Sequence, residues 1–423
     1  MRKVEAIKVT LWGHDVGYLA LLRGGSIAFE YAPEFKALGL EIAPLEMPLA
    51  TTATYLSPEV STTFQRLPGV IADCLPDQFG TTVIHAFFKC KYGWEPPAVS
   101  ALDRLLYIGD RAIGALEFTP AIDDTGPASA HMELQALAAM AKATLEGKAE
   151  QLPVEILRLS ASSGGRQAKA LIDFNPAEGT LRHGFSQPAP GFVPCLIKFD
   201  GARDGDPSNV FGRLEFVYAQ LARDCGIDMP KTYLLEGEGE EGQVAHFVVE
   251  RFDRDEGKRK TVHFASLCGL LNRDFRVKHS ASYEDFLRVT HHLSADLSQV
   301  EQAFRRMVFN IILRNQDDHT KNVGFVMNRN GSWQLAPAFD LTYVYGHGVA
   351  STHQMTLGGK DDLFTLDDMR EIGKRHGLKW PRTRSIVEQV TTVANSFLSM
   401  GVAHGLEEAF AAGISSRFRM LLL

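Results

Sequence analysis

The chain has 423 residues, of which 45% are hydrophobic and 22% charged, and it carries a formal net charge of -7 at pH 7. This length predicts two or three packed subdomains rather than a single core. The composition is typical of a folded globular protein and excludes disorder over most of the chain. The acidic balance argues against a protein that grips nucleic acid over most of its surface, because binding phosphates needs clustered Lys and Arg.

The cysteines and the N-terminal segment bear on the cellular compartment. Five cysteines are scattered along the chain without a C-x-x-C spacing, which predicts neither a disulfide framework nor a zinc site. The first residues lack the apolar core of a signal peptide, and no stretch approaches the ~20 apolar residues that span a bilayer. We therefore expect a cytoplasmic protein with no membrane role.

The first part of the chain is predicted to be rich in strands. Residues 4–30 alternate apolar and polar types, which is typical of short antiparallel strands. In residues 101–118 an apolar stretch is interrupted at Gly109-Asp110, so we expect a helix end and then another hairpin. A Pro-containing segment at 119–127 marks the expected boundary of a first domain covering residues 1–125.

The middle of the chain mixes one amphipathic helix, expected at residues 130–145, with short strands. Strands are expected at residues 196–199 and 245–250, and a further helix at residues 214–223. The acidic stretch 236–242 is expected to be a solvated hairpin loop. After Phe264 the pattern becomes helical, with helices expected at residues 266–271, 283–293 and 300–313. This order predicts an α+β fold, although many functions share such an outline.

The loop after the last of these helices concentrates polar residues that can carry chemistry. Residues 315–322 read Asn-Gln-Asp-Asp-His-Thr-Lys-Asn. An Asn330-Gly331 pair follows and predicts a tight hairpin between two apolar strands. The returning strand ends at Asp340, so we expect the hairpin to carry this residue back beside Asp317 and Asn322.

This group contains the parts that phosphoryl transfer requires: a carboxylate to orient the attacking hydroxyl, and an amide and a second carboxylate to hold Mg²⁺. Asp317 and Asn322 have the D-x-x-x-x-N spacing of a kinase catalytic loop, and Asp340 stands where the metal-binding Asp of D-F-G stands. Any one of them could simply cap a turn after a helix. The three together, with His319, are harder to explain as capping.

The sequence therefore predicts a two-lobed protein-kinase-like fold with a β-rich N-terminal subdomain and a helical C-terminal lobe. In this interpretation residues 1–125 form the N-terminal subdomain. Residues 126–253 form the nucleotide-binding part, and residues 254–423 form the helical lobe with the catalytic loop.

Candidate phosphate-binding residues lie in the middle part. Lys198 sits inside an apolar strand, where an ammonium is costly unless it meets a carboxylate or phosphates; the alternative is an edge-strand Lys facing water. Glu215 on the following helix could pair with Lys198, as in a kinase Lys–Glu ion pair, or face solvent. The small-residue loop at 160–165, followed by Lys169, could let backbone N–H groups approach phosphate oxygens, although a Gly pair more often marks a plain turn.

The strand at residues 245–250 ends at the expected junction between the lobes. Backbone groups around Glu250 could hydrogen-bond an adenine there, and Phe252 could cover the base. A core strand that simply leaves its sheet is an equally good interpretation of the same residues.

Together these residues resemble the HipA family of serine/threonine kinase toxins, and the resemblance covers nearly the whole chain. The matching motifs are Leu11-Trp-Gly13, Pro44-Leu-Glu-Met-Pro48, Asp103-Arg-Leu-Leu-Tyr-Ile-Gly109, Ser162-Ser-Gly-Gly165 with Lys169, Ile197-Lys198, Val249-Glu-Arg-Phe-Asp253, Asn315-Gln-Asp-Asp-His-Thr-Lys-Asn322 and Leu335-Ala-Pro-Ala-Phe-Asp-Leu-Thr342. Departures are the Arg-Gln-Ala residues before Lys169 and the acidic stretch at 236–242, which could alter regulation or substrate choice.

The resemblance implies a role for each matching position. Asp317 would be the catalytic aspartate, and Asn322 and Asp340 would hold Mg²⁺. Ser162 would be an autophosphorylation site that silences the kinase, with the neighbouring Ser163 as the alternative. The implied contacts to ATP are Lys198, Lys169, Ser163, Gly164 and Gly165 at the phosphates, Glu250 and Phe252 at the adenine, and His319 and Phe339 near the nucleotide.

The resemblance also implies partners. These are an aminoacyl-tRNA synthetase as the phosphorylated target and a small helix-turn-helix antitoxin of the HipB type, through which DNA would be contacted only indirectly. Three other functions stay open: a regulator or co-repressor with weak catalysis, a small-molecule kinase of the aminoglycoside-phosphotransferase type, and a phosphohydrolase. In the last, Asp317, Asp318, His319 and Asp340 would all bind metal.

Overall fold

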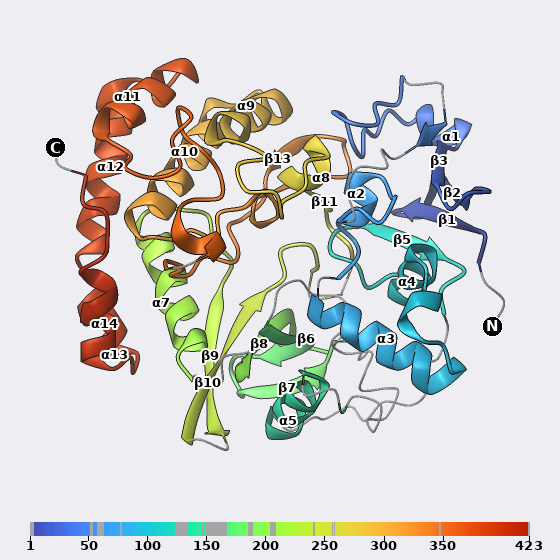
Figure 1. Ribbon diagram of the computed structural model, residues 1–423, viewed down its shortest axis with the longest axis horizontal. Helices are drawn as coiled ribbons and strands as arrows, with labels where there is room; N and C mark the ends of the chain where they lie inside the picture. The colour runs from blue at the N-terminus through green and yellow to red at the C-terminus, as the bar shows by residue number, and fades with distance from the viewer. Residues whose placement is uncertain are drawn as a thin grey trace. The chain divides into compact units, whose positions relative to one another are not determined.

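The computed structural model describes residues 4–50, 54–56, 63–76, 78–122, 134–145, 148, 167–184, 189–203, 209–239, 242–255, 257, 259–346 and 348–421. These residues form two compact units (Figure 1). The first unit draws on residues 1–212, 233–265 and 328–331, and the second on residues 213–232, 266–327 and 332–423. Each unit is described by itself below.

The first unit contains two antiparallel sheets. The N-terminal sheet has the strand order β4-β3-β2-β1-β5. Its strands are β1 Ala6–Leu11, β2 His14–Leu21, β3 Ile27–Tyr31, β4 Tyr55–Leu56 and β5 Leu116–Thr119. In β2 the residues Val16, Gly17 and Leu19 are buried, and Tyr18 is exposed. The strands predicted in residues 4–30 are therefore confirmed.

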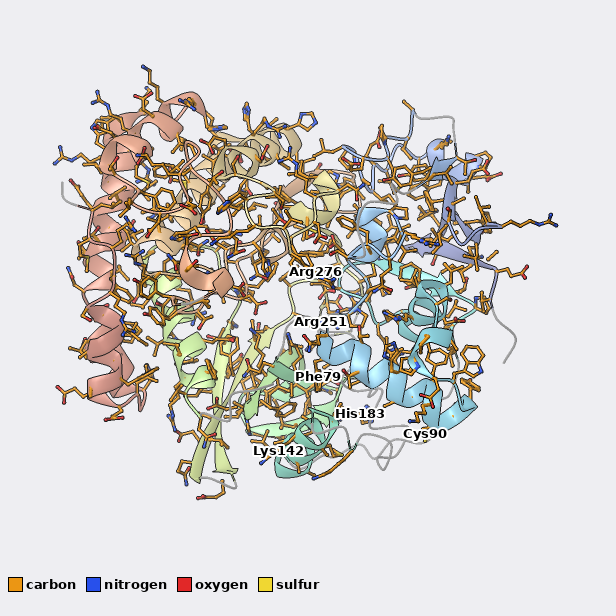
Figure 2. All side chains as sticks on the ribbon, viewed as in Figure 1. Phe79, Cys90, Lys142, His183, Arg251 and Arg276 are labelled. Atoms are coloured by element: carbon orange, nitrogen blue, oxygen red, sulfur yellow. The ribbon has the colours of Figure 1, made fainter. Side chains whose placement is uncertain are left out.

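Helices accompany the N-terminal sheet. They are α1 Pro33–Lys36, α2 Gly69–Ala72, α3 Gln78–Tyr92 and α4 Ala101–Ile108, with a short 3-10 helix at Pro96–Ala98. Helix α3 has the buried Phe79 near its start and the exposed Cys90 near its end (Figure 2). Helix α4 ends at Gly109 as predicted, but the hairpin expected after it is wrong. A single strand follows, β5, and it pairs with β1, because the matching partner lies at the start of the chain.

The second sheet of this unit has the order β7-β6-β8-β10-β9, and helix α5 Leu134–Leu145 contacts β6 and β8. Its strands are β6 Gln167–Asn175, β7 Thr180–His183, β8 Val193–Arg203, β9 Thr232–Gly239 and β10 Gly242–Glu250. The acidic loop expected at residues 236–242 was predicted too long, because β9 continues to Gly239 and β10 starts at Gly242. Strand β11 His263–Ser266 lies where the segment 233–265 of this unit ends, and residues 328–331 complete the unit.

The second unit is mostly helical. It contains α7 Phe211–Asp224, α8 Leu267–Leu271, α9 Tyr283–Ser294, α10 Leu297–Ile312, α11 Leu366–Arg375, α12 Trp380–Ala394, α13 Phe397–Ala403 and α14 Glu408–Ser415. Helix α10 is buried along most of its length and packs against α9 and α12. The predicted α+β fold, β-rich in its N-terminal part and helical in its C-terminal part, is confirmed.

A hairpin interrupts these helices after α10. Strands β12 Gly324–Met327 and β13 Trp333–Leu335 pair antiparallel, and Gly331 has the positive φ that the tight turn requires. Short 3-10 helices lie at Thr320–Asn322 and Gly348–Ser351. No helix in the described part of the chain is long and apolar enough to cross a membrane.

Candidate catalytic loop and nucleotide-binding residues

The loop between α10 and β12 brings three predicted site residues together in the second unit. The Asp317 side chain is 49% exposed, and its Oδ1 lies 3.7 Å from Nε2 of His319. The side-chain amide of Asn322 donates to the carbonyl oxygen of Asp317 at 2.9 Å, and its backbone N–H donates to the carbonyl of His319. The loop is therefore closed on itself, with the Asp317 carboxylate on its accessible side.

Several polar atoms of this loop are buried without a hydrogen-bond partner among the described residues. They are Nδ1 of His319, Oγ1 of Thr320, and both side-chain polar atoms of Gln316. Native proteins leave few buried polar groups unsatisfied, and such groups tend to mark functional sites or bound solvent and ligands. His319 also packs its ring on Phe275, with centroids 4.9 Å apart, so its orientation is fixed.

The segment after the hairpin returns to this loop. Val344 forms a parallel bridge with Asn315, and the N–H of Gln316 donates to the carbonyl of Val344 at 2.9 Å. The residues just before Asp317 therefore run beside the residues that follow Asp340. Asp340 itself has φ +54°, a left-handed conformation that a residue with a side chain rarely adopts. Strained backbone of this kind clusters at functional sites.

Asn322 and Asp340 suit a magnesium ion by chemistry. Mg²⁺ prefers hard oxygen ligands, usually one or two protein groups together with phosphates and water. Because the Asn322 amide nitrogen is used by the Asp317 carbonyl, its Oδ1 is directed away from that bond and can serve as a ligand. Among the described residues, no three or more His, Cys, Asp and Glu side chains form a group that could hold a metal by themselves.

Asp318 has the opposite environment to Asp317. Its side chain is fully buried and accepts hydrogen bonds from the Tyr283 hydroxyl, from Nδ1 of His353 and from the backbone N–H of Gln354. Both of its carboxylate oxygens therefore accept hydrogen bonds from buried groups of the unit. This environment disfavours the phosphohydrolase interpretation, which needs Asp318 as a metal ligand beside Asp317.

In the first unit, Lys169 and Lys198 face each other. Strands β6 and β8 are adjacent, and the two lysines are directly opposite in their register, so both side chains stand on the same face. Both residues are buried, and Nζ of Lys198 lies 5.7 Å from the centroid of the Phe247 ring. The two lysines give this face positive charge, which suits the phosphate chain of a nucleotide.

The end of β8 is fixed by Asp200, two residues after Lys198. Its carboxylate accepts the backbone N–H groups of Phe211 and Gly212 at the start of α7, at 3.1 and 3.3 Å. Burial raises the pKa of Asp200 to about 6, although these N–H groups oppose the rise. A Cβ atom at Gly212 would lie 1.8 Å from the carbonyl oxygen of Ala245, so only glycine allows this close approach of helix and strand.

Strand β10 ends at the predicted adenine-contacting residues. Glu250 accepts the hydroxyl of Tyr233 at 2.6 Å, and burial together with Glu250 raises the pKa of Tyr233. The Phe252 ring packs against Phe264, with centroids 6.0 Å apart. Both residues therefore have fixed orientations at the strand end.

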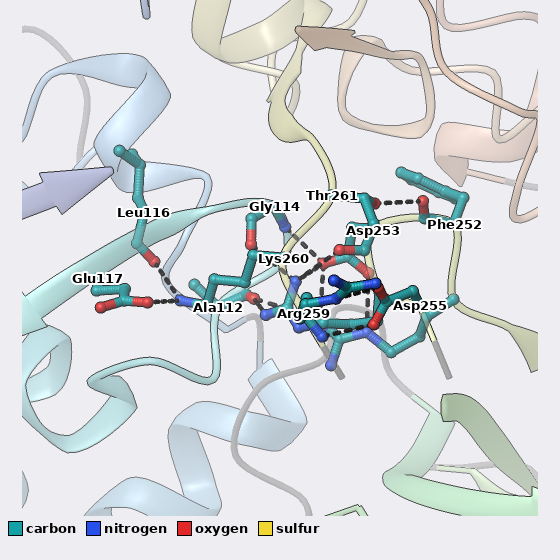
Figure 3. Close-up of polar contacts among 12 residues, drawn as sticks. Ala112, Gly114, Leu116, Glu117, Phe252, Asp253, Asp255, Arg259, Lys260 and Thr261 are labelled. Carbon is teal, nitrogen blue, oxygen red and sulfur yellow. Dashed lines mark hydrogen bonds and ion pairs between the residues drawn. The ribbon is translucent and has the colours of Figure 1, made fainter. Parts of the chain in front are cut away.

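A buried ionic cluster immediately follows (Figure 3). Arg251 and Arg254 both donate to the carboxylate of Asp253, and the N–H of Gly114 donates to the same group at 2.7 Å. Both guanidinium groups also donate to the carbonyl oxygen of Ala112. Burial opposes ionisation, but the two arginines lower the pKa of Asp253 to about 2. The cluster joins the strand end to the segment between α4 and β5.

The predicted site residues thus form two groups, one in each unit. The first unit carries Lys169, Lys198, Glu250 and Phe252, and the second carries Asp317, His319, Asn322, Phe339 and Asp340. Glu215 is buried on α7 in the second unit. Ser162, Ser163, Gly164 and Gly165 lie outside the described residues.

Sequence reasoning did not find the Asp318 contacts or the Asp253 cluster. For Asp253 a signal was present, because the run Arg-Phe-Asp-Arg at 251–254 places two cations beside a carboxylate in an apolar context. For Asp318 there was none, because its partners Tyr283 and His353 are each 35 residues away.

Comparisons with known proteins show which family the chain belongs to. Residues 7–119 match the HipA N-terminal domain, and residues 161–397 match the HipA-like C-terminal domain. A Haemophilus influenzae protein named as a kinase is 32% identical over 139 residues, a match that spans 31% of this chain and 40% of that protein. The Sinorhizobium fredii protein Y4dM, also named as a kinase, is 24% identical over 94% of this chain and 96% of its own length.

Among solved structures, the chain resembles HipA of Shewanella oneidensis MR-1, which was determined in a complex with HipB and operator DNA. The TM-score is 0.66 with 17% sequence identity, and the match covers 97% of this chain and 95% of that one. A likeness at this identity shows a shared fold. Since the C-terminal domain match alone spans more than half of the sequence, the chain belongs to the HipA family, a family of serine/threonine protein kinases.

Proposed function

We propose that this chain is an ATP-dependent serine/threonine protein kinase in which Asp317 orients the acceptor hydroxyl. The observation that carries the proposal is the environment of Asp317. Its carboxylate is half-exposed, while Asn322 and the neighbouring Asp318 are tied down by hydrogen bonds. To accept a hydrogen bond from an incoming hydroxyl, a carboxylate must be both accessible and rigidly held.

The other residues fit supporting roles. Lys198 and Lys169 would neutralise the phosphates of ATP, with Glu250 and Phe252 at the adenine and His319 and Phe339 beside the nucleotide. Asn322 and Asp340 would hold Mg²⁺, which supplies charge neutralisation on the transferring phosphoryl group when bound. Catalysis would then consist of positioning and charge compensation, because phosphoryl transfer needs little covalent help from the protein.

We further propose that the kinase silences itself by phosphorylating Ser162, or Ser163, in the loop that also carries Gly164 and Gly165. A phosphate adds about two negative charges at neutral pH. In a loop that covers the phosphates of ATP, this charge would repel the nucleotide and displace the loop.

The biological role proposed for the chain is that of a toxin. Its substrate would be a protein hydroxyl, with an aminoacyl-tRNA synthetase as the expected target. A HipB-type antitoxin would be its partner and would provide the contact with operator DNA. The complex in which the Shewanella protein was determined supports looking for such a partner.

The test is phosphate transfer from γ-labelled ATP with Mg²⁺, comparing the wild type with Asp317→Gln. Label on Ser162 or Ser163, mapped by mass spectrometry and reduced ~10²–10⁴-fold in the variant, is expected for loss of a positioned carboxylate. Acceptor profiling with protein extract and with aminoglycosides separates a protein kinase from a small-molecule kinase. If the wild type binds ATP but transfers nothing to any acceptor, the regulatory interpretation replaces the kinase.

A further inference from the structure

The buried carboxylate of Asp318 joins three segments of the second unit. It accepts the hydroxyl of Tyr283 at 2.5 Å, Nδ1–H of His353 at 2.8 Å and the backbone N–H of Gln354 at 2.7 Å. Tyr283 is the first residue of α9, and the other two donors belong to the segment that follows Asp340. Neither the Asp318 nor the His353 side chain has any exposed surface.

The chemistry of the Asp318 carboxylate determines which of the contacting groups donate hydrogen bonds. An ionised carboxylate only accepts, so His353 must donate from Nδ1, and its buried Nε2 has no hydrogen-bond partner in the described part of the chain. Burial alone would raise the pKa of Asp318, but His353, Tyr283 and the Gln354 N–H together hold it below its usual value.

Further hydrogen bonds connect the residues around Gln354 to neighbouring parts of the unit. The carbonyl of Gln354 accepts the N–H of His279, and the carbonyl of Thr356 accepts the N–H of Tyr283. The Gln354 side chain also donates to the carbonyl of Gln316, next to Asp317. The segment at 341–356, which we call the return segment, is thereby tied both to the catalytic loop and to the start of α9.

In many protein kinases the corresponding stretch after the metal-binding Asp is ordered only when it is phosphorylated, through a new pair between phosphate and arginine. Here the negative charge is that of Asp318 on the catalytic loop, and two of its three donors, His353 and Gln354, lie on the return segment. We propose that Asp318 is a positioning residue that keeps Asp317 and the return segment in their working arrangement without phosphorylation of that segment. This inference rests on the proposed kinase activity and concerns the regulation of the same site.

The proposal predicts different effects for two substitutions of Asp318. Asp318→Ala removes all three acceptor bonds, and the catalytic loop loses its support. Asp318→Asn can keep them, because the amide oxygen can accept from Gln354 while the amide nitrogen donates to Tyr283 and to His353 in its other tautomer. Asp367→Ala, which removes an exposed aspartate of α11, is the matched control.

Steady-state kinetics test the proposal first. Asp318→Ala is expected to lower kcat about 10²-fold, the scale of an ~1 Å misplacement of a catalytic group, while KM for ATP changes by less than ~3-fold. Asp318→Asn is expected to recover kcat to within about 10-fold of the wild type, and Asp367→Ala to match it. A purely structural role would lower only the fraction of folded protein, so kcat per folded molecule, with folding measured by circular dichroism, would match the wild type. Wild-type kcat in Asp318→Ala overturns the proposal.

Two further measurements keep the outcome clear. Hydrogen exchange is expected to be faster in residues 341–356 of Asp318→Ala than in the wild type, and unchanged exchange overturns the proposal even if no phosphate transfer is found. Treatment of active wild type with phosphatase should not lower the rate, and mass spectrometry should find no phosphate on the return segment. A phosphorylated segment whose dephosphorylation abolishes activity refutes the inference and leaves the proposed kinase function intact.

Discussion

Replacing Asp253 by Asn should destabilise the first unit strongly. The carboxylate is 2% exposed and takes charged hydrogen bonds from Arg251 and Arg254 at 2.6–2.9 Å, as well as the N–H of Gly114. Its pKa falls from 3.8 to about 2, which corresponds to about 2 kcal/mol of stability at pH 7. Removing the charge also takes from two largely buried guanidinium groups the carboxylate that they share, so we expect a total loss of about 3–5 kcal/mol.

Urea unfolding followed by circular dichroism measures this loss, with Asp255→Asn as the control. Asp255 also pairs with an arginine, Arg259, but that partner is 80% exposed, so the control should lose less than ~1 kcal/mol. Because the folded-state pKa of Asp253 is depressed, its contribution is present above pH ~4 and disappears as the pH falls towards 2. A loss below 1 kcal/mol in Asp253→Asn would refute the assignment of this cluster as a structural anchor.

Three further predictions concern other parts of the first unit and one control in the second. Gly212→Ala forces a Cβ to 1.8 Å from the Ala245 carbonyl and should cost about 1–3 kcal/mol in urea unfolding, whereas Gly413→Ala, with open space around it in α14, should be neutral or stabilising. Lys198→Met should weaken ATP binding about 10–100-fold by calorimetry, as expected for loss of a charged hydrogen bond, and unchanged affinity would contradict its proposed role. Burial lowers the pKa of His263 to about 4. The free energy of unfolding should therefore fall by up to about 3 kcal/mol as the pH drops from 6.5 to 4, because the unfolded chain takes up the proton first. His263→Phe should flatten that part of the stability–pH profile.

The elements that sequence reasoning predicted well are those with strong local patterns. Helix α10 carries apolar residues at helical spacing, and the Asn330-Gly331 turn is specified by two adjacent residues. The loop at 315–322 was found because its chemistry is compressed into eight consecutive positions. In these cases the information that determines the structure lies within one or two turns of chain.

The features that were missed depend on pairing between distant segments. The prediction of a hairpin after α4 failed because β5 pairs with β1, more than a hundred residues earlier. The facing positions of Lys169 and Lys198 depend on the register of β6 and β8, which shifts between Gln167 and Lys169. A slip of one residue would turn one lysine to the other face, so no local pattern could have predicted that the two lysines occupy directly opposite positions.

The two buried aspartates should respond differently to the same substitution. Asp318 is held by a hydroxyl, an imidazole and a backbone N–H, and the first two can exchange donor and acceptor roles. Asp253 is held by guanidinium groups, which have donors but no acceptor and keep their charge. An Asn side chain can therefore be accommodated at 318 by a tautomer change, while at 253 its amide hydrogens would face further donors. Asp318→Asn should thus unfold at nearly the wild-type urea concentration and Asp253→Asn far below it; similar losses in both would show that burial, rather than the chemistry of the partners, determines the cost.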